Sequence, residues 1–174
     1  MLDPGSCKGL VLDTSVWINL LATEAMEAIL AALALPCHVP EQVVMEVKRH
    51  PATGVVFSAG DHPLRQSSPG VAIISLEGAE LDLFLEIVGA PAGDALGDGE
   101  AAAIAVAASR GLDLVIDDRK ARRILRERFS HVRTHWTVDL LRARAVIRAL
   151  GRRRTDECLA KAQRLGRMYI PRNQ

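Results

Sequence analysis

Short apolar runs alternate with longer amphipathic segments along this chain, and the runs predict the strands of a sheet. The clearest runs lie at residues 10–12, 71–76 and 112–116, and the first and third end directly at aspartates. Runs of this length are typical of strands that are buried on both faces. Residues 38–40 predict a short extended segment, and residues 131–135 predict an edge strand.

The segments between these runs predict helices. The first helix is expected from residues 14–15 to about residue 34, because its apolar positions recur at helical intervals and Pro36 ends it. Segments 51–70 and 89–97 are rich in Gly and Pro and predict loops. Further helices are expected at 41–50, 77–88, 100–110, 119–128, 137–150 and 155–166.

This order of elements predicts the fold class and the domain organisation. Strands that alternate with helices indicate an α/β fold, here a three-layer α/β/α arrangement with a mostly parallel sheet. A chain of 174 residues is long enough for one domain with its own core. We therefore expect a single domain over residues 1–174, with a loop insert at 51–70 and a basic helix and tail at 151–174.

Composition predicts an aliphatic core and a cytoplasmic location. Apolar residues make up 49% of the chain and aromatic residues only 3%, which suits helices packed on a parallel sheet. Three scattered cysteines, Cys7, Cys37 and Cys158, indicate reduced thiols. The start of the chain lacks the pattern of a signal peptide, and the longest apolar run, 28–39, is too short to cross a membrane.

The net charge of +1 conceals a strong asymmetry along the chain. Residues 1–100 carry 4 Lys and Arg against 14 Asp and Glu, a net charge of −10, whereas residues 101–174 carry 18 against 7, a net charge of +11. The acidic part could hold cations, and the basic part could hold a polyanion such as nucleic acid. Alternatively, the charges lie on helix surfaces and the two parts of the chain attract each other. The sequence alone does not distinguish ligand binding from this mutual attraction.

Acidic residues recur where strands end and helices begin. Asp13 and Asp117 each follow a strand expected to be central, Glu100 begins the helix that leads into the second of these strands, and Glu46 lies among valines. Because the carboxyl ends of parallel strands meet at one edge of a sheet, these carboxylates are expected there together. Such a cluster indicates a site for Mg²⁺ or Mn²⁺, which activates water and stabilises charge on a phosphate.

Each of these acids also has a purely structural interpretation. Asp13 could accept hydrogen bonds from amides at a helix start, and the aspartate pair 117–118 could cap the following helix. Glu100 could favour the positive end of a helix dipole, and Glu46 could be a surface residue. Asp98, which precedes a glycine, is expected as a turn residue.

Basic residues directly follow the aspartate pair. Arg119 and Arg122 share a helix face beside the expected site, where they could hold RNA phosphates, pair with the aspartates or point to solvent. A second basic stretch at 142–154 could bind RNA or a protein, or form a solvated helix face. The sequence shows no aromatic stripe for base stacking, and Trp17 and Trp136 are expected in the core or at a dimer contact.

Four segments with acidic residues follow one another over about residues 9–150. They are Leu-Val-Leu-Asp-Thr-Ser ending at Ser15, Val-Pro-Glu-Gln-Val-Val-Met-Glu-Val around Glu46, Leu-Gly-Asp-Gly-Glu-Ala-Ala-Ala-Ile-Ala-Val-Ala around Glu100, and Leu-Val-Ile-Asp-Asp-Arg-Lys-Ala-Arg ending at Arg122. In this order they resemble the motifs of PIN domains. The resemblance implies a PIN fold, Mg²⁺- or Mn²⁺-dependent cleavage of RNA, and likeness to the VapC-type toxins of toxin–antitoxin pairs.

The resemblance also implies roles for individual residues. It places Asp13, Glu46, Glu100 and Asp117 on the acidic catalytic positions, and it places Thr14 and Ser15 on hydroxyl positions expected to contact substrate. The toxins carry their last acid one position later, which favours Asp118, so the choice of Asp117 or Asp118 as a metal ligand with Asp13 and Glu100 stays open. The partners implied are RNA, an antitoxin protein and a second copy of the chain in a homodimer.

Two rival functions remain. The first is a PIN-like domain that has lost catalysis and binds RNA or a protein partner. The second is an unrelated α/β phosphotransfer or phosphatase-like enzyme with Asp13 or Asp117 as nucleophile. It is disfavoured because Ser15 stands where the second aspartate of an Asp-x-Asp motif is expected near the first strand.

Overall fold

A five-stranded parallel sheet organises the chain in the computed structural model, which describes residues 7–58, 62–65 and 70–171. In the described residues every strand pairing is parallel, so the sheet predicted as mostly parallel is wholly parallel there. The strands lie in the order β3-β2-β1-β4-β5, with β1 at the centre. They are β1 (Leu10–Leu12), β2 (Cys37–Pro40), β3 (Val71–Ile74), β4 (Asp113–Val115) and β5 (Thr134–His135).

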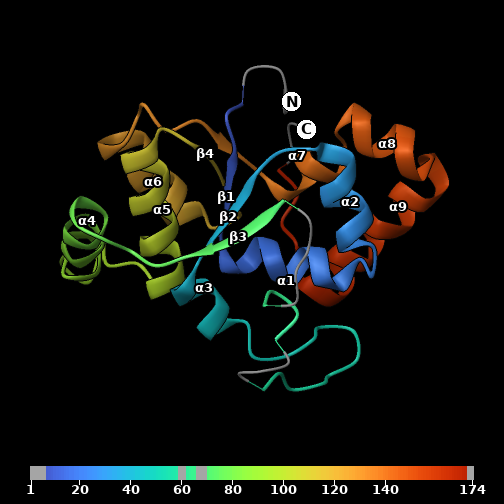
Figure 1. The fold of residues 1–174 in the computed structure, drawn as a ribbon, viewed down its shortest axis with the longest axis horizontal. Coiled ribbons are helices and arrows are strands. Elements are labelled where there is room, and N and C mark those ends of the chain that lie inside the picture. Colours follow the sequence, from blue (N-terminus) through green and yellow to red (C-terminus); the bar gives the residue numbers. More distant parts are fainter. Residues whose placement is uncertain (1–6, 59–61, 66–69, 172–174) are drawn as a thin grey trace.

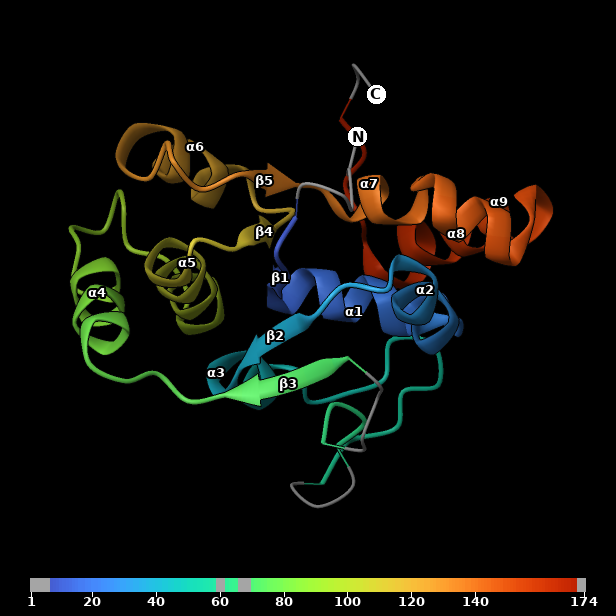
Figure 2. The ribbon, with the colours of Figure 1, turned by 45° about the horizontal axis from the view of Figure 1, so that its top comes forward.

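Helices cover both faces of this sheet, and the predicted three-layer α/β/α architecture is confirmed (Figure 1, Figure 2). One layer consists of α4 (Ala79–Val88), α5 (Asp98–Arg110) and α6 (Arg119–Arg128). The short α3 (Glu41–Glu46) directly follows β2. The opposite layer consists of α1 (Thr14–Ala22), α2 (Met26–Leu33), α7 (Thr137–Leu141), α8 (Arg144–Leu150) and α9 (Arg152–Lys161), which continues into a π-helical turn, η2 (Ala162–Gly166).

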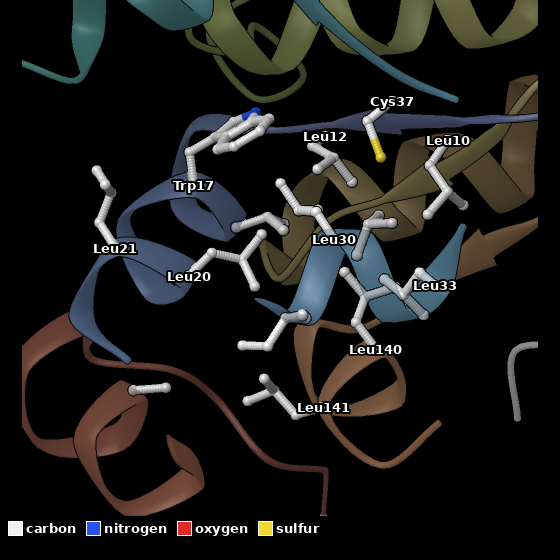
Figure 3. Packing of buried hydrophobic residues seen from close by; sticks show 14 of the residues in the cluster. Leu10, Leu12, Trp17, Leu20, Leu21, Leu30, Leu33, Cys37, Leu140 and Leu141 are labelled. Carbon is white, nitrogen blue, oxygen red and sulfur yellow. The ribbon is translucent and has the colours of Figure 1, made fainter. Parts of the chain in front are cut away.

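An apolar core lies on each side of the sheet, because successive side chains of a strand point to opposite faces. On the central strand, Leu10 and Leu12 belong to the core beneath α1 and α2, and Val11 belongs to the core beneath α5 and α6. Figure 3 shows the first core, to which Trp17 from α1 and Leu140 from α7 also belong. Both cores are largely aliphatic, as the composition predicts.

The small side chains of α5 allow this helix to lie close to the sheet. Its alanines 101, 102, 103, 105 and 107 are all fully buried, and the helix packs against β1, β2 and β4. Gly111 adopts a left-handed conformation with a φ of 63° and ends the helix, as the sequence indicates. Close packing of α5 brings its first turn, with Glu100, to the edge where the strands end.

The helix predicted from residues 14–15 to 34 is wrong as a single element. It breaks after Ala22 into α1 and α2, which are bent by 115° relative to each other. The Thr23 hydroxyl donates to the carbonyl of Leu20 at 2.6 Å and accepts from the amide of Ala25 at 3.1 Å, and Glu24 takes a left-handed φ of 54°. This local hydrogen-bonded turn replaces helical bonds although the apolar pattern continues.

Other predicted helix limits also need correction. The helix predicted at 137–150 divides at Ala143, whose ψ of 137° is extended, and the helix predicted at 41–50 ends at Glu46. The last helix begins at Arg152, earlier than predicted, and ends in the π-helical turn. Part of the insert predicted at 51–70 lies outside the described residues, as does the end of the tail predicted at 151–174.

No single helix of the described chain is both long and apolar enough to cross a membrane. The pair α1 and α2 meets the length and composition requirement only as two helices bent by 115°. Most of their buried residues belong to the first core of the domain.

Ion pairs join the acidic and the basic parts of the chain. Most lie at the surface, where an ion pair contributes about 0–1 kcal/mol. Some of the opposite charges of residues 1–100 and 101–174 therefore neutralise each other in ion pairs. Other basic residues of the second part form no such pair within the described chain and could contact a polyanion. The pairs are Arg110 with Glu80, Arg123 with Asp94, Arg128 with Glu86, and Lys161 with Glu24.

Candidate functional site

Acidic side chains from four elements come together at the carboxyl-terminal edge of the sheet. Asp13 follows β1, Glu46 ends α3, Glu100 lies in the first turn of α5, and Asp118 immediately precedes α6. Burial, and to a smaller extent the charges of Asp13, Asp118 and Glu46, together raise the pKa of Glu100 to about 7. These four carboxylates therefore share one electrostatic environment.

Strand geometry explains which aspartates face this environment. Val11 and Ile116 belong to the core beneath α5, and every second residue of an extended segment points to the same face. Asp13 and Asp118 have the same parity as Val11 and Ile116, so both point toward α5 and Glu100. Asp117 has the parity of Val115, which belongs to the opposite core.

Asp13 is the most buried of the four acids, with 1% of its surface exposed. It caps α1, and its Oδ2 accepts hydrogen bonds from the amide of Ser15 at 3.3 Å and from the Ser15 hydroxyl at 2.6 Å. Burial raises the pKa of Asp13 to about 6 despite these hydrogen bonds. Its Oδ1 is buried and has no hydrogen-bond partner within the described chain.

Glu46 connects the beginnings of two helices. Its Oε2 accepts a hydrogen bond from the Thr14 hydroxyl at 2.5 Å, and its Oε1 accepts one from the amide of Gly99 at 2.9 Å. A Cβ at position 99 would lie 2.3 Å from the Thr14 hydroxyl oxygen and 2.4 Å from Glu46 Oε2, so any larger residue would displace these two side chains. Both oxygens of Glu46 thus fix α1 relative to α5.

Glu100 and Asp118 are each fixed through one carboxylate oxygen. The amide of Gly97 donates to Glu100 Oε2 at 3.2 Å, and the amide of Ala121 donates to Asp118 Oδ1 at 2.7 Å. In the described part of the chain, the second oxygen of each accepts no hydrogen bond, as is the case for Asp13. Three carboxylates therefore present one fixed and one available oxygen each.

Asp117 belongs to a separate buried network. Its Oδ2 accepts from Asn19 Nδ2 and from the Thr137 hydroxyl, both at 2.7 Å, and its Oδ1 accepts from the Thr137 amide at 2.8 Å. Burial raises the pKa of Asp117, and these hydrogen bonds oppose the shift. The structure therefore brings Asp118, and not Asp117, into the environment of Glu100.

Sequence reasoning missed Asn19, Thr137 and Gly99 as residues that build this edge. Asn19 carried a usable signal, because it is the one amide within the apolar segment 16–22, and a buried amide needs hydrogen-bond partners. Asp98, expected as a turn residue, is exposed at the first position of α5.

The residues predicted to contact substrate have different environments. The hydroxyls of Thr14 and Ser15 hold carboxylates of the site. Arg122 Nη1 donates to the backbone carbonyls of Ile116 at 3.2 Å and of His135 at 3.0 Å, so this side chain clamps the ends of β4 and β5. Arg119 is exposed, and no carboxylate within the described chain pairs with it.

The donor set at this edge suits a hard divalent cation. Mg²⁺ prefers carboxylate oxygens, takes one or two of them directly and keeps several waters. The buried, unpartnered Oδ1 of Asp13 and the available oxygens of Glu100 and Asp118 meet that requirement. Across residues 7–58, 62–65 and 70–171, no three acidic, histidine or cysteine side chains are placed close enough to hold one ion together.

Comparison with known protein families gives a match over nearly the whole chain. The sequence model of the PIN-domain family matches residues 9–171, which include all four acids and the helices that carry them. A comparison with curated proteins finds no match for the chain.

Replacing Gly99 by alanine should disrupt the contact between α1, α3 and α5. The added methyl group would meet the Thr14 hydroxyl and the Glu46 carboxylate, and overpacking of this kind costs about 1–3 kcal/mol. Urea unfolding of Gly99→Ala measures that loss. Gly93→Ala is the matched control, because a Cβ there meets no atom within 4 Å. Equal stability of the two variants would contradict the assigned contact.

The stability of the metal-free protein should fall as the pH rises from about 4 to about 7. Asp13 and Glu100 have pKa values raised to about 6 and about 7, so the folded chain binds their protons more tightly than the unfolded chain. Their stabilising contribution is complete below about pH 4 and is lost as the pH rises through the raised values. For Asp13 alone the change is on the order of 3 kcal/mol.

Urea unfolding in the presence of a chelator, measured across this pH range, tests the expectation. A double variant, Asp13→Asn with Glu100→Gln, should show a much weaker loss, because neither replacement titrates. If wild type and double variant have parallel pH profiles, the two carboxyls are not in the environment described above.

Proposed function

The chain belongs to the PIN-domain family, and from this premise we propose that it is a divalent-metal-dependent ribonuclease that hydrolyses RNA phosphodiester bonds. PIN domains are generally nucleases and typically use divalent metals. The strongest support in the structure is the set Asp13, Glu100 and Asp118, each with one oxygen fixed by the chain and the other available.

In this proposal Asp13, Glu100 and Asp118 hold Mg²⁺ or Mn²⁺, directly or through water. The bound cation supplies an activated water and stabilises negative charge on the phosphate. The Ser15 hydroxyl and the amides of Gly97 and Ala121 orient the three carboxylates before the cation arrives. We assign the third metal ligand to Asp118 and not to Asp117, because both oxygens of Asp117 accept hydrogen bonds from Asn19 and Thr137.

Glu46 has a positioning role in this proposal. Since its two oxygens accept hydrogen bonds from the Thr14 hydroxyl and the Gly99 amide, it sets the separation between the turns that carry Asp13 and Glu100.

The two arginines that follow Asp118 have different roles in this proposal. Arg119, exposed and next to Asp118, is suited to contact an RNA phosphate. Arg122 stabilises this edge of the sheet by donating hydrogen bonds to carbonyls at the ends of β4 and β5.

Exchanging each aspartate of the pair separately should divide their roles. Asp118→Asn should lower the rate of RNA cleavage by more than about 100-fold, because a lost metal ligand removes several kcal/mol of stabilisation. Its stability should change little, since Asn also caps helices well. Asp117→Asn should lower the free energy of unfolding by about 1–3 kcal/mol, because an amide would face the donors of Asn19 and Thr137.

Cleavage of a labelled single-stranded RNA with Mg²⁺ or Mn²⁺, together with thermal unfolding, measures both effects. Mn²⁺ should stabilise the wild type and leave Asp13→Asn unaffected. A reversed pattern for the two aspartates would overturn the assignment. A protein that shows neither cleavage nor stabilisation by Mn²⁺ would instead be a binding module on a PIN fold.

We further propose a toxin role in a toxin–antitoxin pair, which the likeness of the motifs to VapC-type toxins supports. Expression of the wild type alone should slow growth of a bacterial host, and the Asp13→Asn variant should not. Co-expression of the product of an adjacent small gene should restore growth. Full growth of cells that make active wild-type enzyme would contradict this role and leave the nuclease proposal intact.

A further inference from the structure

Two aromatic rings and two arginines lie together beside the acidic site. Trp136 follows β5 directly, and Tyr169 comes from the segment after η2. Their ring centroids are 5.4 Å apart and the ring planes are inclined by 49°. The guanidinium of Arg122 lies 3.9 Å from the centroid of Trp136, and that of Arg119 lies 5.8 Å from the centroid of Tyr169.

This aromatic cluster is adjacent to the carboxylates through its neighbours in the chain. Arg119 directly follows Asp118, and Thr137, which directly follows Trp136, donates two hydrogen bonds to Asp117. Arg122 bonds the carbonyls where β4 and β5 end. The cluster therefore lies at the same edge of the sheet as the acids.

The two rings differ in how firmly they are held. Trp136 is half-buried, with Arg122 close over its ring and fixed by two carbonyls. Tyr169, the single tyrosine of the chain, is 39% exposed. Its neighbours Met168 and Ile170 pack against the first core, so they anchor this segment without the help of Tyr169.

Arg119 is held more loosely than Arg122. It is exposed, its distance to the ring of Tyr169 is 5.8 Å, and no carboxylate of the described chain forms an ion pair with it. An arginine of this kind is free to turn toward a phosphate. An exposed ring and an unpaired cation next to an acidic edge are the two components of a site for single-stranded nucleic acid.

We propose that Tyr169, supported from behind by Trp136, stacks on one unpaired base of the RNA while Arg119 contacts a neighbouring phosphate. The inference rests on the proposed function for the nature of the polymer. Stacking needs a base that is not covered by its neighbours in a duplex, so the site selects single-stranded over double-stranded RNA. The stacking is tolerant of sequence, because every base has a π-face.

Binding measured without cleavage tests this site. Fluorescence anisotropy of a labelled single-stranded RNA is followed with the Asp13→Asn protein in Mg²⁺, alone and with a second substitution. Tyr169→Ala and Tyr169→Leu should each weaken binding by about 5- to 100-fold, and Tyr169→Phe should bind like the parent. Leucine keeps an apolar contact with Trp136 but has no π-face, so it separates stacking from simple packing.

An oligonucleotide of the same length with abasic positions supplies a second comparison. It should bind more weakly than normal RNA and show no further loss with Tyr169→Ala. Arg119→Ala should weaken binding to all RNAs and lower the salt dependence by about one phosphate contact. Lys8→Ala is the control and should have little effect, because this exposed cation precedes β1 and lies at the opposite, amino-terminal edge of the sheet.

Several results would overturn the inference: no binding of single-stranded RNA, a preference for the duplex, or equal affinities of Tyr169→Ala and the parent. The proposed function fails in a different way. If RNA binds with the expected dependence on Tyr169 but the wild type does not cleave it with Mg²⁺ or Mn²⁺, the nuclease proposal is wrong and the stacking site stands.

Discussion

Burial of carboxylates at one edge of the sheet is the constraint on which the rest of this structure depends. Burial of Asp13 and Glu100 raises the pKa of both, so the metal-free fold keeps these groups at a cost in free energy. The chain offsets the cost with donors from helix starts and from Ser15, which bind one oxygen of each acid. Glu46 and Gly99 then hold the helix starts together.

The alternation of side chains at a strand end gives two adjacent aspartates different surroundings. Asp117 continues the face of Val115 and enters the layer of α1 and α7, where Asn19 and Thr137 occupy both its oxygens. Asp118 continues the other face and lies among the acids near α5. The position of each residue along the strand therefore supports the proposal of Asp118 as the metal ligand, a choice that the family motif alone leaves open.

The features that could be predicted from the sequence are those set by strand periodicity and sheet topology. Strands β1 and β4, helix α5 and the meeting of Asp13 with Glu100 follow from apolar runs and from the topology of parallel sheets. The break at Thr23 could not be predicted, because one side-chain hydrogen bond overrides an apolar pattern that continues through it. The cluster of Trp136 and Tyr169 was missed for a different reason, since only tertiary packing brings these distant residues together.

The C-terminal segment is joined to the acidic edge through Asn19. A Cβ at Gly166 would lie 2.3 Å from Asn19 Oδ1 and 2.9 Å from its Cα, so the π-helical turn lies directly against this residue. Asn19 in turn donates to Asp117, whose other partner, Thr137, follows Trp136. One buried network thus fixes the end of β4, the start of α7 and the turn that leads to Tyr169. The PIN-domain match continues to residue 171 and therefore includes this segment.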